Sequence, residues 1–190
     1  MANIFYEVED NLFSNEEIIF DENKIKDYML SFIYNHLNSF EEKEKPFAFE
    51  NIVYDFFIYM KIPLVKTKKT RDLGIDGIIK LNLNLLGEIN LGLQIKNKLI
   101  DSNDIDLFLS ALKNSELQLG VMICKDSRRL DKYELNSKIR AILLSKGILL
   151  RERLIKENIN INPVFILKLE DIIEIVSSEM RSAIRAIYKK

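Results

Sequence analysis

The chain is poor in the residues that build covalently or metal-stabilised small folds. It has one cysteine, Cys124, and one histidine, His36, among 190 residues. A single cysteine excludes an intramolecular disulfide, and these two residues are too few for a structural Cys/His zinc site, which takes four ligands. Cys124 ends an apolar stretch, so we expect it to pack as a small apolar side chain.

Tryptophan is absent, glycine and proline number six and three, and no long uncharged apolar run occurs. No window approaches the ~18 apolar residues of a membrane-spanning helix. The N-terminal MANIFYEVEDNLF is acidic and lacks a basic start, so we expect no secretory signal and a cytoplasmic location. With 47% hydrophobic and 30% charged residues, the composition is that of a folded domain rather than a disordered chain.

The formal net charge of −1 hides an asymmetry along the chain. Residues 1–50 carry four Lys against twelve Asp and Glu, whereas the remaining 140 carry 24 basic and 17 acidic groups. Opposite signs predict an acidic arm beside a body that can meet a polyanion, although solvated surface would look the same. The basic residues that we expect to contact nucleic acid are Lys66, Lys68, Lys69, Arg71, Arg128 and Arg129.

Apolar periodicity predicts a helix over 22–44, and Pro46 then forces a break. We therefore expect an acidic helical extension over residues 1–45 and a core domain over 46–190. Within the core, a helix is predicted over 47–60. A short strand at PLVKT follows, and then two extended runs, IIKLNL and INLGLQIK, that form a hairpin.

The rest of the chain alternates between helices and strands. Helices are predicted over 103–115, 134–146 and 169–188, with strands over 119–124 and in NPVFIL. A hairpin followed by alternating helix and strand predicts an α/β, three-layer core with a central mixed sheet flanked by helices.

The second run of the hairpin alternates between apolar and polar residues. Its predicted polar face carries Asn90, Gly92, Gln94 and Lys96, with Gly92 leaving that face uncrowded. Asp76 lies between Gly74 and Gly77 near the start of the partner run, so antiparallel pairing would bring it alongside Gln94 and Lys96. Glu50, near the start of the preceding helix, is a further polar group that can converge there.

Two carboxylates and an amide oxygen suit Mg²⁺, which takes one or two carboxylates and keeps several waters. A lysine beside such a metal can deprotonate the attacking water or stabilise charge on the phosphorane. Taken singly, each feature has an ordinary reading: Asp76 as a turn residue, Glu50 as a helix-dipole acid, and Gln94 with Lys96 as a solvated strand face.

The order Phe49-Glu50 on a helix, GIDG with Asp76, and QIK with Gln94 and Lys96 resembles the Mrr-like restriction endonuclease domain of the PD-(D/E)xK nuclease superfamily, in its Q-x-K variant. The resemblance covers about residues 47–125. It implies a restriction-endonuclease-like fold that cleaves DNA with Mg²⁺, for which Mn²⁺ would substitute.

By that likeness, Asp76 is the metal-binding aspartate, Lys96 the catalytic lysine, Gln94 the replacement for the usual second acid, and Glu50 the helix glutamate. The carbonyl of Ile95 would also touch the metal. The neutral Gln94 removes one negative charge from the site. The resemblance also implies a homodimer or a partner protein that supplies specificity.

Two functions stay open. The first is a Mg²⁺-dependent DNA endonuclease of the restriction or defence type, although a junction resolvase would show much the same motif. The second is a nuclease-fold module whose catalysis has lapsed and that binds DNA or a protein partner. Gln94 and the basic runs favour the second, and the joint motif favours the first.

Overall fold

The computed structural model describes residues 3–14, 22–67, 74–82, 88–117, 119–127 and 164–188. The chain forms two compact units: residues 1–60 together with 169–190, and residues 61–168. We call them the helical unit and the sheet unit. Within the described ranges, no helix is long and apolar enough to cross a bilayer.

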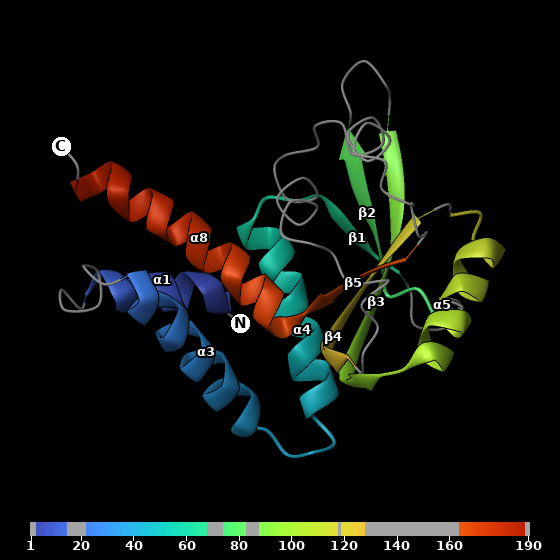
Figure 1. Ribbon diagram of the computed structural model, residues 1–190, viewed down its shortest axis with the longest axis horizontal. Helices are drawn as coiled ribbons and strands as arrows, with labels where there is room; N and C mark the ends of the chain where they lie inside the picture. The colour runs from blue at the N-terminus through green and yellow to red at the C-terminus, as the bar shows by residue number, and fades with distance from the viewer. Residues whose placement is uncertain are drawn as a thin grey trace. The chain divides into compact units, whose positions relative to one another are not determined.

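The sheet unit is built on five strands in the order β1-β2-β3-β4-β5 (Figure 1). They are β1 (Leu64–Lys66), β2 (Gly77–Asn82), β3 (Glu88–Ile100), β4 (Leu119–Ser127) and β5 (Val164–Lys168). β1, β2 and β3 pair antiparallel, whereas β3, β4 and β5 pair parallel. This mixed sheet confirms the predicted α/β class, and each predicted strand is present.

Helix α5 (Ser102–Asn114) connects β3 to the parallel strand β4. It begins at Asp101, whose carboxylate accepts hydrogen bonds from the backbone N–H groups of Asn103 and Asp104, as in a capping box. Its apolar side packs with the sheet in one buried cluster. That cluster includes Ile75, Ile100, Ile105, Phe108, Leu112, Met122 and Ile166.

This packing corrects the prediction of an uncrowded polar face on β3. Gly92 and Gln94 are buried. A Cβ atom on Gly92 would lie 2.5 Å from Leu112 Cδ2, and one on Gly120 would lie 2.7 Å from the ring of Phe108. The two glycines therefore give α5 room to approach the sheet, because any larger side chain would collide with it.

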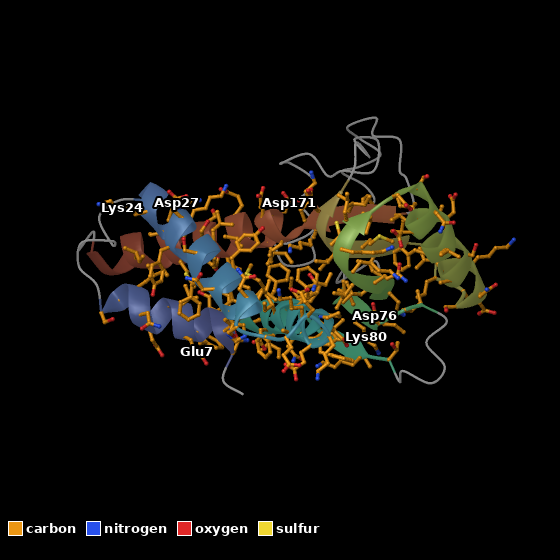
Figure 2. The ribbon with its side chains drawn as sticks, turned by 90° about the horizontal axis from the view of Figure 1, so that it is seen from below. Glu7, Lys24, Asp27, Asp76, Lys80 and Asp171 are labelled. Atoms are coloured by element: carbon orange, nitrogen blue, oxygen red, sulfur yellow. The ribbon has the colours of Figure 1, made fainter. Side chains whose placement is uncertain are left out.

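The helical unit contains α1 (Ile4–Phe13), α3 (Glu22–Asn38), α4 (Lys45–Tyr59) and α8 (Leu169–Tyr188). Figure 2 labels Glu7 on α1 and Lys24 and Asp27 on α3, and all three are exposed. The core between the helices is apolar. Its fully buried side chains include Phe5, Val8, Ile25, Met29, Ile33, Phe56, Ile173 and Val176.

Three sequence predictions need comment here. The helix predicted over 22–44 ends at Asn38. Helix α4 begins at Lys45 with Pro46 in its first turn, where a backbone N–H has no acceptor within the helix and proline is therefore tolerated. The helix α1 was not predicted. The helix expected over 134–146 lies outside the described residues. The domain boundary at residue 45 stays a prediction.

Candidate active site

The GIDG segment leads into β2 and is held between β1 and β3. The backbone N–H of Asp76 donates to the carbonyl of Leu93 at 2.7 Å, and the N–H of Thr67 donates to the carbonyl of Asp76 at 3.2 Å. The hydroxyl of Thr67 also donates to the carbonyl of Ile75. The backbone around Asp76 is therefore fixed on both sides.

The carboxylate of Asp76 lies against β3. Its Oδ2 accepts a hydrogen bond from the backbone N–H of Ile95 at 2.6 Å. The regular register between β2 and β3 ends at the pair Gly77 and Leu93. Beyond that pair, the side chain of Asp76 takes the place of a backbone acceptor, so its position is set by strand geometry rather than by a flexible rotamer.

The carbonyl of Ile95 is directed to the same edge of β3. In a strand, the N–H and C=O groups of one residue point towards the same neighbouring strand. Because the N–H of Ile95 points to Asp76, its carbonyl oxygen faces that side as well. The Asp76 carboxylate and the Ile95 carbonyl oxygen therefore share one edge of β3, next to the start of β2.

Gln94 precedes Ile95 and contacts Gly74, the first residue of the GIDG segment. Its Nε2 donates to the carbonyl of Gly74 at 2.6 Å, and the residue is 5% exposed. Within the described part of the chain, Gln94 Oε1 is a buried oxygen with no hydrogen-bond partner. An unsatisfied buried acceptor costs about 1–3 kcal/mol, so a ligand at this oxygen would be stabilising.

Gly74 makes the contact with Gln94 possible. Its φ is +90°, a left-handed conformation that favours glycine. A Cβ atom there would lie 3.2 Å from Gln94 Nε2. The sequence predicted that Gln94 would face a metal and did not predict this contact with Gly74. A turn glycine gives no sign of which side chain, twenty residues further on, will bind its carbonyl.

Lys96 is two residues beyond Gln94 on β3, on the same face, and pairs with Cys124 of β4. It is partly exposed. The register between β3 and β4 shifts directly after it: Lys96 pairs with Cys124 and Leu99 with Asp126, so β3 has one residue more than β4, as in a β-bulge. Bulges bend a strand and re-aim nearby side chains, and they are frequent beside active sites.

Glu50 belongs to α4 of the helical unit, where its Oε1 accepts a hydrogen bond from the hydroxyl of Tyr54 at 2.9 Å. Its convergence on Asp76 stays a prediction.

Among the predicted DNA contacts, Lys66 is exposed on β1. Lys68, Lys69, Arg71, Arg128 and Arg129 lie outside the described residues. Lys80, exposed on β2 and labelled beside Asp76 in Figure 2, is a cation that the sequence reading did not select.

The oxygen donors at this edge fit a hard divalent cation. Asp76 offers a carboxylate, Ile95 a backbone carbonyl, and Gln94 an unsatisfied amide oxygen, all of them ligand types that Mg²⁺ accepts. Among the residues that the structure describes, no group of three or more His, Cys, Asp or Glu side chains is placed to hold a metal. Any metal here would keep several waters or bind phosphate oxygens.

Comparison with known proteins identifies the family of the chain. The family model Mrr_cat, described as restriction endonuclease, matches residues 42–153. That match covers the helix with Glu50, the GIDG segment and the QIK strand. No curated protein and no solved structure matched the chain. With more than half of its length matched, the chain belongs to the Mrr-type restriction endonuclease family.

Proposed function

We propose that the protein is a Mg²⁺-dependent DNA endonuclease of the Mrr-like restriction and defence type, in a Q-x-K variant, acting in the cytoplasm. One observation carries the proposal. The Asp76 carboxylate is hydrogen bonded to the backbone of Ile95, directly between Gln94 and Lys96. This hydrogen bond brings Asp76 next to the two β3 residues that flank Ile95, which supports a site built on all three.

The residues that would hold the metal are Asp76, Gln94 through Oε1, Ile95 through its carbonyl, and Glu50. When bound, a divalent cation lowers the pKa of a coordinated water and neutralises charge on the phosphoryl oxygens. Mn²⁺ has similar oxygen preferences and would substitute. The N–H of Ile95 keeps the Asp76 carboxylate oriented before any ligand arrives.

Lys96 would act on the reacting groups. As an ammonium, its Nζ can donate to a phosphate oxygen on which charge develops, and as an amine it can take a proton from the attacking water. Partial burial on β3 lowers the competition from bulk water. Loss of a positioned acid or base costs about 10²–10⁴ in rate.

DNA is the proposed substrate. Besides Lys66, the basic residues expected to contact phosphates are Lys68, Lys69, Arg71, Arg128 and Arg129. Cleaving both strands of a duplex would require either a homodimer or a partner protein that supplies a second centre and the sequence specificity.

The test is a cleavage panel of supercoiled, linear, single-stranded and branched DNA with Mg²⁺, Mn²⁺ or EDTA. We expect metal-dependent cleavage by the wild type that Asp76→Ala and Lys96→Ala each abolish. Lys113→Ala, which removes an exposed cation of α5, should leave it intact. Cleavage in EDTA, or cleavage retained in both variants, would contradict the proposed site.

A second function, binding DNA without cleaving it, is favoured by the neutral residue at position 94. A module that only binds DNA would show no cleavage under any condition. Its affinity would fall steeply with salt, because each neutralised phosphate releases counterions, and it would be unchanged by Asp76→Ala.

A further inference from the structure

The amide of Gln94 has two ends with different surroundings. Its Nε2 donates to the Gly74 carbonyl, whereas its Oε1 is buried and has no hydrogen-bond partner among the residues that the structure describes. Only the NH₂ end can donate to a carbonyl oxygen, so the contact with Gly74 fixes which way the amide faces. The orientation that leaves Oε1 available is therefore imposed by the GIDG segment.

This contact joins the two halves of the motif at a second point. Gly74 is two residues before Asp76, and Gln94 is next to Ile95, whose N–H holds the Asp76 carboxylate. The two hydrogen bonds, both 2.6 Å long, lie on successive β3 residues and bind residues of the same GIDG segment. Loss of the Gln94 contact would free the backbone of Gly74, which lies two residues before Asp76.

We infer that Gln94 is a positioning residue for Asp76, in which the amide N–H bond to Gly74 is the required feature, so that an acid at position 94 would impair the site. A glutamate carboxylate has no proton to donate, and its oxygens would face the Gly74 carbonyl oxygen. This reverses the expectation that replacing the neutral residue with an acid strengthens the centre.

The inference about catalysis rests on the proposed function, whereas the contact itself can be tested without activity. Backbone amide hydrogen exchange of Ile95 and of residues 74–77 reports how firmly the segment is held. The variants are Gln94→Glu, Gln94→Met and Asn90→Asp. Met has a similar volume but no donor, and Asn90→Asp adds the same charge at an exposed position on the same strand.

We expect exchange from this segment at pH 7, corrected for intrinsic rates, to be alike in the wild type and Asn90→Asp. Gln94→Met should exchange about tenfold faster, which is the effect of one hydrogen bond. Gln94→Glu should exchange at least as fast as Gln94→Met. Wild-type protection in either Gln94 variant would overturn the inference.

The activity arm uses the ratio of variant to wild-type cleavage rates. For Gln94→Glu this ratio should lie below one, without tighter Mn²⁺ binding. A faster Gln94→Glu enzyme with a lower Mn²⁺ requirement would overturn the inference. If the wild type does not cut DNA, the proposed function fails, and the exchange arm still decides the role of Gln94.

Discussion

At the scale of single residues, Asp76 has a structural duty in addition to the proposed chemical one. Its carboxylate is the acceptor for the Ile95 N–H directly before the start of β2. A buried backbone donor must find an acceptor, and a charged acceptor makes a strong bond. Substitutions at Asp76 therefore change stability and activity together unless the acceptor is kept.

This predicts different stabilities for two inactive variants. Asp76→Ala leaves the Ile95 N–H without an acceptor and should lower the free energy of unfolding by about 1–3 kcal/mol. Asp76→Asn keeps an amide oxygen at that position and should lose clearly less. Urea unfolding measures both. Equal stability of Asp76→Ala and the wild type would show that the Asp76–Ile95 bond contributes nothing.

Gly92 gives the second prediction at this scale. Gly92→Ala would place a methyl group 2.5 Å from Leu112 Cδ2, and such overpacking costs about 1–3 kcal/mol of unfolding free energy. In a Leu112→Ala background the clash is gone, so the same substitution should cost much less. A double-mutant cycle by urea unfolding measures the coupling. Additive effects would mean that α5 does not pack on Gly92.

At the scale of helices and strands, α3 and α8 are joined by charge as well as by apolar packing. Lys26 Nζ lies 2.7 Å from Glu174 Oε2, and Arg181 Nη2 lies 3.3 Å from Glu174 Oε1. The hydrogen bond from Lys26 lowers the pKa of the Glu174 carboxyl, with a smaller contribution from Arg181. The stabilisation is therefore present while Glu174 is ionised.

Because the folded-state pKa is lowered, this stabilisation is complete above the ordinary pKa of 4.5 and is lost as the pH falls through the folded value. Glu174 is 44% exposed, so water and salt screen the pair and limit it to about 0.2–1 kcal/mol. Glu174→Gln should be less stable than the wild type at pH 7, with the gap closing below pH 4.5. Thermal unfolding at both pH values measures this. A gap that widens in acid would contradict it.

The elements differ in how much of their origin lies in local sequence. Strand β3 was predictable because its alternation of apolar and polar residues spans eight positions. Helix α1 was missed although Ile4, Phe5, Val8 and Leu12 form an apolar stripe. Its first turn has a local cap, Asn3, whose Oδ1 accepts the backbone N–H of Phe5 at 3.0 Å. A second acceptor, Asp55 Oδ2, binds the N–H of Ile4 at 3.0 Å from 51 residues away, and that contact leaves no local pattern.

The candidate site shows the same limit. Spacing on two strands predicted that Asp76 would lie alongside Gln94 and Lys96. It could not predict that the regular pairing of β2 with β3 would begin only at Gly77. Nor could it predict that Asp76 would bind a backbone N–H, or that α5 would bury Gln94. The burial of Gln94 goes with the close approach of α5 to the sheet, for which Gly92 and Gly120 leave room.

At the scale of the whole molecule, the charge asymmetry follows the two compact units. The helical unit carries 8 Lys and Arg against 17 Asp and Glu, and the sheet unit carries 20 against 12. The positive unit also contains Asp76, Gln94 and Lys96. The part of the chain that would bind a polyanion therefore holds most of the motif that would cleave it.

The helical unit combines residues from both ends of the chain, which bears on the predicted extension over residues 1–45. Truncating those residues would remove α1 and α3 and expose the apolar side chains of α8, including Ile173 and Val176. We expect the truncated chain to lose helical circular dichroism and to be cleaved by trypsin at Arg181. Protection of Arg181 after truncation would instead support residues 46–190 as an independent domain.

The central claim is that a metal-dependent nuclease centre is built on Asp76. Its most direct test is the single-turnover cleavage rate of Asp76→Asn, the variant expected to stay folded, against wild type in Mg²⁺. Asp106→Asn, an exposed position on α5, is the matched control. We predict a loss of at least about 100-fold for Asp76→Asn, since metal stabilisation contributes several kcal/mol, and wild-type rates for the control. Cleavage by Asp76→Asn at the wild-type rate would contradict the account.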